Sequence, residues 1–547
     1  MGRLTSFLWI LLVCLPAIAQ APMAHEPSAP ATLMPGLGDL HHPVSTANAE
    51  AQQFFDQGLR LIYAFNHEEA ARSFQRAAEL DPGLAMAYWG VAEAIGPNYN
   101  DPASAGRFKL AHEAIQKAVD LSSGASPSEK AYIAAMARRF PADPNADFRK
   151  AAEEYHDAMR EVMRQFPDDP DAATLFAESG MDLHPWDLWN QDGTPQPWTP
   201  EIVSTLESVI GRYPNHLGAV HYYIHAVEAS PAPWRALSAA DRLPSLAPAA
   251  GHIVHMPAHI YIRTGDYLGA VNTNEKAAAA DEAYIKSSGA QGMYPMMYYS
   301  HNLHFIAVCG GMDGDYARAK DAARRLAANV TPHLKEVPML EAFMTIPIEV
   351  DIRFHRWNDL LGMPQPDAAM PVSTFFWHFG RGMAFAGTGK IVEAEAEYKI
   401  VSETESKTPA DLLFAPPVAN KTKDIFKIAE DMLAAKIALA QSNSAQAIAL
   451  LTSAVSVQDT LKYNEPPDWP FPAREALGAM LLMKGDAAAA EKVFREDLDR
   501  NPRNPRSLFG LEEALKAQGR NYDAGFVDSA FHSAWRGNAT LKLEDLV

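Results

Sequence analysis

The sequence predicts an all-α protein, and three observations lead to that prediction. Alanine-rich segments recur along the 547 residues, hydrophobic residues make up 48% of the chain, and runs that alternate β-branched and polar residues are few. Half-buried strands need such alternation, whereas alanine-rich segments favour helices. A chain of this length also has room for many helices around a large core.

Internal repeats predict how these helices are arranged. The segment FFDQGLRLIYAFNHEEAARSFQRAAELDP begins at Phe54 and ends at Pro82, with small residues at Gly58 and Ala70 and an aromatic residue at Phe74. This pattern resembles the tetratricopeptide repeat, in which each unit is a helix A, a tight turn and a helix B.

A second copy lies near the other end of the chain. In AREALGAMLLMKGDAAAAEKVFREDLDRNP the same offsets hold Gly478, Gly485, Ala490, Phe494 and Pro502. The resemblance implies a right-handed superhelical solenoid of helical hairpins whose A helices line a concave inner groove. The whole arrangement also resembles a group of exported bacterial tetratricopeptide proteins.

Weaker copies fill the interval between these two, and a last unit caps the array; they span residues 222–248, 252–281, 301–326, 377–401, 428–454 and 507–531. The Trp- and Pro-rich stretches after Met181 and at 463–472 lack a helical period, so we expect ordered loops that fold over one face. The predicted divisions are a signal peptide (1–19), a Pro-rich extended arm (20–48), an N-terminal repeat block (49–180), a loop or lid (181–215), a central His-rich block (216–345) and a C-terminal block with capping helices (346–547).

The first residues resemble an export signal. Arg3 precedes the apolar run FLWILLVCLPAIA, which ends in the small residues Ala17 and Ala19. That pattern is typical of a secretory signal peptide, so we expect a periplasmic or secreted protein. Beyond this leader the chain contains one cysteine, Cys309, so its core must hold the fold without an internal disulfide.

Charge restricts the classes of partner. Lys and Arg number 47 against 67 Asp and Glu, a net charge of −20. Nucleic acid and anionic membranes both favour cationic faces, so we expect neither as a partner. No later stretch approaches the roughly 18 uninterrupted apolar residues that a membrane-spanning helix needs.

Histidines cluster in the central block. The 84 residues from His221 to His304 contain seven, where the chain average gives about three. Measured back from the small helix B residues Ala236, Ala270 and Ala319, they use only three positions, 18, 15 and 11 residues upstream. Together with Glu228, one turn beyond the second histidine, the candidate metal ligands are His221, His225, His252, His255, His259, His301 and His304.

These spacings favour a transition-metal site. Residues three, four and seven apart share one helical face, and packed helices lie about 8–10 Å apart, so imidazoles from neighbouring A helices can converge. Neutral imidazoles suit copper best, with zinc or iron next, and suit magnesium or calcium poorly. The His-x-x-x-His segments HYYIH and HMPAH are similar to those of dinuclear copper proteins such as tyrosinase and haemocyanin, a likeness of ligand geometry alone. It implies a copper oxidoreductase acting on a small organic substrate in the groove.

Two alternatives stay open. His221, His225 and Glu228 could form a two-histidine, one-carboxylate set for a zinc- or iron-dependent enzyme. Otherwise the histidines are hydrogen-bonded groove residues of a scaffold that binds a protein or peptide without metal. The sequence does not decide whether His41, His42 or His184 joins the site.

Overall fold

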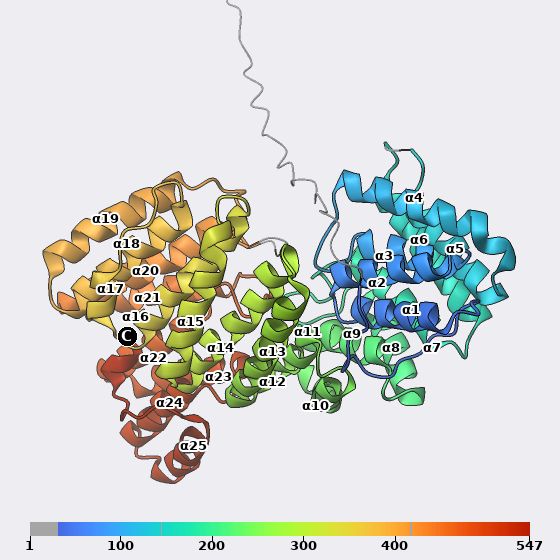
Figure 1. Cartoon of the computed structure of the whole chain (residues 1–547). Helices are drawn as coiled ribbons and strands as arrows, with labels where there is room; N and C mark the ends of the chain where they lie inside the picture. The colour runs from blue at the N-terminus through green and yellow to red at the C-terminus, as the bar shows by residue number, and fades with distance from the viewer. Residues whose placement is uncertain (1–30, 144, 416–417, 419) are drawn as a thin grey trace, which may run out of the picture.

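The computed structural model describes residues 31–143, 145–415, 418 and 420–547. The predicted signal peptide and the first part of the arm lie outside these residues. Within them the chain folds into helices, with isolated bridges and no β-strand, and successive helices pack against each other along the chain (Figure 1). The predicted all-α solenoid of tetratricopeptide-type hairpins is confirmed.

The N-terminal block lies at one end of the molecule, in blue and cyan in Figure 1. Its helices pack as the pairs α1/α2, α3/α4, α5/α6 and α7/α8. Their bounds are α1 (Ala49–Ile62), α2 (His67–Leu80), α3 (Ala85–Ile95), α4 (Ala105–Leu121), η1 (Ser122–Gly124), α5 (Pro127–Arg139), α6 (Phe148–Gln165), α7 (Pro170–Leu183) and α8 (Thr199–Arg212).

The predicted loop at 181–215 is too long. Helix α7 continues to Leu183, and α8 begins at Thr199, with Pro200 in its first turn, and packs on α7. Proline favours the first turn of a helix, where its missing N–H costs no hydrogen bond. The irregular segment is therefore 184–198, and the remainder completes a helical hairpin.

The central block, green in Figure 1, joins the two ends of the molecule. Its helices are α9 (Leu217–Glu228), η2 (Pro233–Ala236), α10 (Leu237–Leu246), α11 (Gly251–His255), α12 (Pro257–Thr264), α13 (Tyr267–Ser288), η3 (Tyr294–Tyr298), α14 (Tyr299–Asp313), α15 (Tyr316–Val330), η4 (Thr331–His333) and η5 (Pro338–Thr345). The turn between α12 and α13 shows how local sequence sets these bounds. Gly265 adopts φ +80° and ends α12, and the Asp266 side chain caps α13 by accepting from the Gly269 N–H.

The C-terminal block, yellow to red in Figure 1, continues the array. Its helices are α16 (Ile346–Arg353), α17 (Trp357–Gly362), α18 (Pro371–Gly387), α19 (Ile391–Lys407), α20 (Thr422–Ala440), α21 (Ser444–Gln458), α22 (Ala473–Met483), α23 (Ala487–Arg500), α24 (Pro505–Ala517), α25 (Asn521–Ala534) and η6 (Leu543–Leu546). The pairs α18/α19, α20/α21, α22/α23 and α24/α25 match the repeats predicted for this region.

The two strongest repeats owe their pattern to one packing contact. The Phe74 ring of α2 lies between two glycines, Gly58 on α1 and Gly90 on α3; a Cβ on these would lie 2.6 and 2.4 Å from the ring. Phe494 lies in the same way between Gly478 and Gly510. Glycine is required at these positions because each aromatic ring fills the space where two A helices meet one B helix.

The described part of the arm, 31–48, runs across the N-terminal block. Gln57 of α1 accepts from the Met34 N–H at 2.7 Å, and Glu129 of α5 accepts from the Ser45 N–H at 2.6 Å. Two arm histidines bind carboxylates here: His41 Nδ1 lies 2.7 Å from Asp56, and His42 also contacts an aspartate, as described below. Neither reaches the central histidines.

The C-terminal block folds back onto the central one. Arg353 of α16 donates to the Gly311 carbonyl of α14 at 2.6 Å, and within its own block it forms two hydrogen bonds, 3.0 and 3.1 Å long, with the Glu475 carboxylate of α22. The Tyr267 hydroxyl donates to the Pro502 carbonyl at 3.2 Å, so α13 also contacts the last repeats. None of the helices among the described residues has the length and apolar run that crossing a membrane requires.

Candidate metal centre

Three neighbouring A helices bring the predicted ligands together. Helix α9 carries His221, His225 and Glu228, and α14 carries His301. The second unit is divided: α11 presents His252 and His255, the chain bends at Met256, and α12 begins at Pro257 and presents His259. All of these side chains are buried except His301, which is half-buried.

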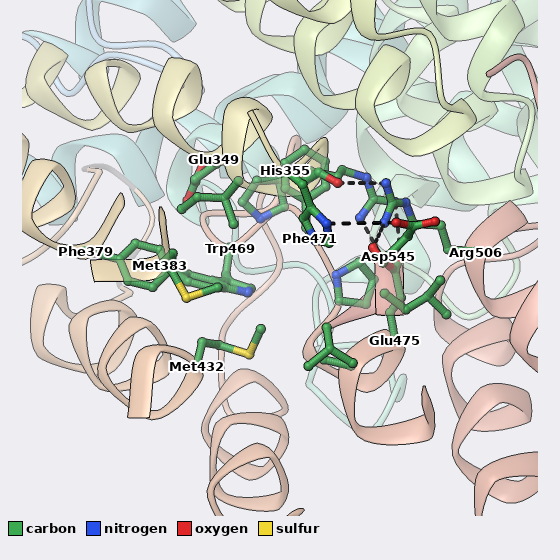
Figure 2. A pocket seen from close by; sticks show the side chains of 17 residues that line it. Glu349, His355, Phe379, Met383, Met432, Trp469, Phe471, Glu475, Arg506 and Asp545 are labelled. Atoms are coloured by element: carbon green, nitrogen blue, oxygen red, sulfur yellow. Dashed lines mark hydrogen bonds and ion pairs between the residues drawn. The ribbon is translucent and has the colours of Figure 1, made fainter. Parts of the chain in front are cut away.

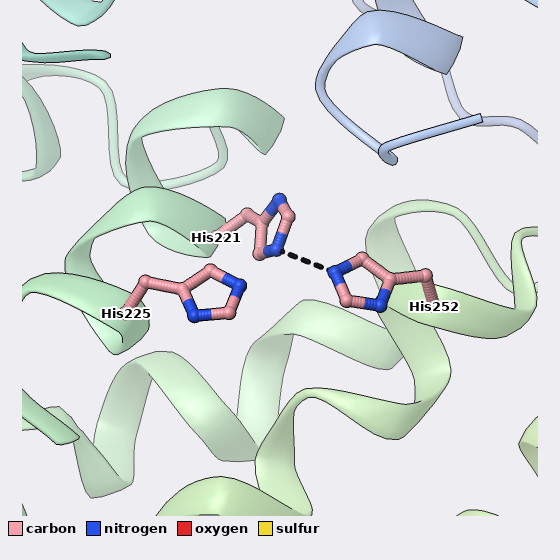
Figure 3. Close-up of side chains that lie close together, drawn as sticks. All are labelled: His221, His225 and His252. Atoms are coloured by element: carbon pink, nitrogen blue, oxygen red, sulfur yellow. Dashed lines mark hydrogen bonds between the residues drawn. The ribbon is translucent and has the colours of Figure 1, made fainter. Parts of the chain in front are cut away.

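The first group of imidazoles consists of His221, His225 and His252. One nitrogen of each lies within 4.8 Å of the others, and the rings face one another across the space between α9 and α11 (Figure 3). The Nε2 atoms of His221 and His252 are 3.1 Å apart. His225 Nε2 is buried and has no partner among the described residues.

The second group consists of His255, His259 and His301, again with nitrogens within 4.8 Å of one another. The Nε2 atoms of His255 and His259 are 2.8 Å apart, and the His301 ring lies 4.7 Å from the His255 ring, centroid to centroid. Each group therefore offers three imidazoles, contributed by two neighbouring helical units.

Glu228 links the two groups. Its Oε1 accepts from His225 Nδ1 at 3.1 Å, and its Oε2 lies 2.6 Å from His259 Nδ1. The second contact has the distance of an ion pair but not the orientation of a hydrogen bond, since neither atom has a hydrogen-bond partner. The two histidines hold the pKa of Glu228 at about 2 in spite of its burial, so the carboxylate is ionised at neutral pH.

Oxygen atoms behind the ring also orient His221 and His255. His221 Nδ1 donates to the Tyr63 carbonyl at 2.6 Å, and His255 Nδ1 lies 2.6 Å from the Asn274 Oδ1. The Asn274 amide donates in turn to the Ala270 carbonyl, which fixes its oxygen toward the imidazole. In each case the proton resides on Nδ1, so the lone pair is on Nε2 and points into the group. Metal-binding histidines are oriented in this way by acceptors behind the ring.

This arrangement leaves like atoms facing each other. His255 and His259 both have Nδ1 against an oxygen acceptor, so their Nε2 lone pairs meet at 2.8 Å unless a cation lies between them. Burial lowers the pKa of His221, His225, His252 and His255, which keeps these imidazoles neutral at pH 7. Burial also acts on His259, but Glu228 raises its pKa. Without a metal, a second proton on His259 would therefore allow its Nε2 to donate to the Nε2 of His255.

The structure places two of the predicted ligands differently from the expected sets. Glu228 does not join His221, because seven residues separate them and the helix rises about 10 Å over that span; it joins His225 and His259 instead. His304 belongs to none of the groups. Its ring packs 5.5 Å from Phe343, outside the region where the other A helices meet.

Two loops cover the centre, so the histidines do not line an open groove. Trp186 from the 184–198 loop stacks on Tyr99, and the Tyr99 ring lies 5.4 Å from His225. His184 stays apart, stacked on Trp198. The predicted Trp- and Pro-rich loops therefore do fold over the His-rich block.

The second loop contributes a buried carboxyl, Glu465. Burial raises its pKa to about 7, while Arg263 and His259 oppose that rise. Arg263 also lies over the Tyr463 ring of the same loop, 5.5 Å from its centroid. Among the groups oriented toward the histidines, Asn274, the Tyr63 carbonyl and Glu465 were not foreseen from the sequence.

Comparison with known proteins adds little beyond the fold. No family model matches the chain, and no curated protein sequence matches it. The human IFIT1 dimer with m7Gppp-AAAA is 12% identical, with a TM-score of 0.31 over 89% of this chain and 91% of that one. Yeast Tom70 is 10% identical, with a TM-score of 0.29 over 87% and 90%. The P58(IPK) TPR domain is 12% identical, with a TM-score of 0.23 over 86% and 99%. Likeness at this level carries no argument about function, so the tetratricopeptide character rests on the chain's own hairpins and Gly–Phe contacts.

Proposed function

We propose that the central helices bind two transition-metal ions, copper first and zinc or iron next, one in each three-imidazole group, and use them to oxidise a small organic substrate. The observation that carries this proposal is the orientation of the rings. Oxygen acceptors hold the Nδ1 side of four histidines, so their Nε2 lone pairs face each other in a buried space. A metal ion relieves that opposition and uses those lone pairs as ligands.

The donor set supports the choice of metal. Each group offers three nitrogen ligands and no thiolate, which suits copper or zinc and disfavours magnesium and calcium. Three protein ligands leave a coordination position open, as in catalytic sites, whereas structural zinc sites are closed by four. Glu228 supplies one negative charge shared between the two groups, which increases the basicity of His225 and His259 as ligands.

A pair of copper ions suits two-electron oxidation. Copper held by His221, His225 and His252 and by His255, His259 and His301 would supply the two-electron acceptor for oxidation of a diphenol to a quinone and two protons. Dioxygen takes four electrons and four protons from two such cycles and becomes two molecules of water. Dioxygen is also small enough to reach a centre covered by two loops. Because residues 1–19 resemble a secretory leader, we propose that this activity belongs to the periplasm or the outside of the cell.

Metal analysis tests the proposal. We expect purified full-length protein, loaded separately with copper, zinc and iron and then desalted, to retain copper best. A His221→Ala/His255→Ala variant removes one ligand from each group and should lose the metal. The matched control is His184→Ala, which removes a histidine outside both groups and should retain the metal.

Wild-type protein that holds less than about a tenth of an equivalent of every metal contradicts the proposal and favours a metal-free binding scaffold. For copper-loaded protein, oxygen uptake with diphenols then distinguishes an oxidase from a hydrolase.

A further inference from the structure

A second candidate site lies in the C-terminal block, away from the histidines. Helices α16, α18, α20, α22 and α24, the 469–472 loop and residues 545–547 line a cavity of about 70 Å³ (Figure 2). One wall is apolar and includes Phe379, Met383, Met432 and Phe471. Thioether and aromatic side chains adapt to hydrocarbon of various shapes, so this wall suits the apolar part of a small molecule.

Three polar groups on the cavity lining lack partners. Glu349 Oε1, Trp469 Nε1 and Arg506 Nε are buried atoms with no hydrogen-bond partner among the described residues. The three residues are only 5%, 6% and 4% exposed. Buried polar groups are nearly always paired, and a set that shares one cavity indicates a missing ligand. Two of the three are N–H donors, so the missing ligand carries acceptors.

Charge narrows the class of ligand. Arg506 forms no ion pair within the described parts of the chain; its guanidinium donates to the backbone carbonyls of Arg353 and Asp545. The neighbouring Arg353 is already paired with Glu475. Burial and Arg353 lower the pKa of Arg506 to about 9, so it remains a cation at neutral pH. Glu475 and Asp545 oppose that lowering of the pKa but form no direct ion pair with Arg506. A buried guanidinium that lacks a direct ion pair is costly, and an anionic ligand in contact with it lowers that cost.

The other ionisable groups on the lining do not supply the anion. Burial raises the pKa of Glu349 to about 8, so its carboxyl is mostly protonated at pH 7 and can donate. The Asp545 side chain is 40% exposed and lies 4.0 Å from His355 Nδ1, and its carboxylate makes no ion pair with Arg506. Burial lowers the pKa of His355 to about 3, so that ring is neutral.

We infer that this cavity binds a short-chain monocarboxylate, with its carboxylate at Arg506 and the Trp469 N–H and its hydrocarbon against Met383, Met432 and Phe379. One water molecule occupies about 10–15 Å³ of a cavity measured in this way, so about 70 Å³ holds about five to seven atoms of that size. The ligand therefore has about five to seven heavy atoms. Butyrate, with six, is the natural probe. The site is separate from the metal centre and does not depend on it.

Calorimetric titration of the full chain with butyrate tests this inference. We expect saturable 1:1 binding, at least about tenfold weaker binding of butyramide, which has the same shape without the charge, and weaker binding of octanoate, which exceeds the cavity. Trp469→Phe keeps the ring and removes the N–H, so it should weaken butyrate about tenfold without unfolding the chain. Arg506→Lys should weaken it further because the second N–H fork is lost.

Several results would overturn the inference. If butyrate gives no heat beyond that of dilution, the cavity contains only water and no butyrate site. If sulfate competes with butyrate, or if butyramide binds equally well, the binding is a surface anion effect. Equal butyrate affinity in folded Trp469→Phe and wild-type protein also refutes the site. Because the titration is made both with and without copper, its outcome is independent of whether the histidines bind metal.

Discussion

Two clusters of histidine and carboxylate lie on either side of Tyr63, and their nitrogen atoms face different kinds of partner. In the N-terminal cluster, Asp171 lies 2.7 Å from His42 Nδ1 and 3.0 Å from His216 Nε2, and accepts from the Tyr63 hydroxyl at 2.6 Å. The central cluster has six imidazoles and one carboxylate, Glu228, which contacts His225 and His259.

The difference lies in what each nitrogen faces. His216 is satisfied on both sides, since its Nε2 meets Asp171 and its Nδ1 accepts from the Ala219 N–H. In the central cluster, nitrogen faces nitrogen at 3.1 and 2.8 Å, and His225 Nε2 faces no partner. Burial of several histidines is therefore not diagnostic by itself. Matched donors and acceptors indicate a structural network. Converging lone pairs are the arrangement on which the proposal of a bound cation rests.

The largest expected difference between the clusters is in the response to metal. At a free copper concentration a thousand times the dissociation constant, binding stabilises the fold by about 4 kcal/mol per site. We therefore expect copper to raise the melting temperature of wild-type protein and a chelator to reverse the increase. The His221→Ala/His255→Ala variant serves as the control; an equal increase in that variant would mean that the metal binds elsewhere, for example at His42, Asp169 and Asp171.

Removal of Asp171 should destabilise the fold without affecting metal content. Asp171→Ala leaves the half-buried His42 and the buried His216 and Tyr63 without their shared acceptor, which we expect to cost about 3–5 kcal/mol of unfolding free energy. Urea denaturation measures this cost. Copper bound per folded chain should be unchanged, and a loss of copper would show that the two clusters are coupled through Tyr63.

The pH dependence of stability should report the N-terminal cluster through His42. Burial alone would lower its pKa, but Asp171, with Asp169 and Asp56, raises it to about 9. Because the folded pKa is above the unfolded value of about 6.5, the stabilisation is complete below pH 6.5 and is lost as pH rises through 9. The loss amounts to about 3 kcal/mol. Urea midpoints at pH 6 and 9.5 measure it, and His42→Gln should remove most of this dependence. If both proteins lose equal stability, His42 is not the source.

The smallest effect is expected at the carboxylate of the central cluster. Glu228→Gln preserves the shape but removes the charge that supports His225 and His259, so copper affinity should fall about 10- to 100-fold. Competition with a chelator of known affinity measures the change. The matched control is Glu207→Gln, because the Glu207 side chain is 40% exposed and accepts a hydrogen bond from the Tyr223 hydroxyl, away from the histidines. Comparable affinity losses in the two variants would remove Glu228 from the site.

Repeat register predicted that most of these histidines lie together but not how they pair. His221, His255 and His304 occupy the same register position, yet His304 packs beside Phe343 because its helix borders η5, which carries no histidine. Positions in a repeat specify which face a residue occupies. They do not specify what the next repeat places opposite it.

Contacts from groups outside the A helices could not be predicted from the sequence either. Asn274 belongs to the B helix α13, and the carbonyl that anchors His221 comes from Tyr63, 158 residues earlier. The two covering loops were recognised from their Trp and Pro content, but their direction depends on tertiary contacts such as the hydrogen bond from Gln191 to the Thr460 carbonyl. Such long-range contacts leave no periodic signal in a sequence.

Copper stoichiometry in single-ligand variants tests the central claim most directly. His252 belongs only to the first three-imidazole group, and His301 only to the second. At a buffered free copper concentration that saturates the wild type, we predict about two copper ions per wild-type chain and about one in each of His252→Ala and His301→Ala. One ion in the wild type, or variants that retain both ions while folded, would contradict the account of two adjoining sites.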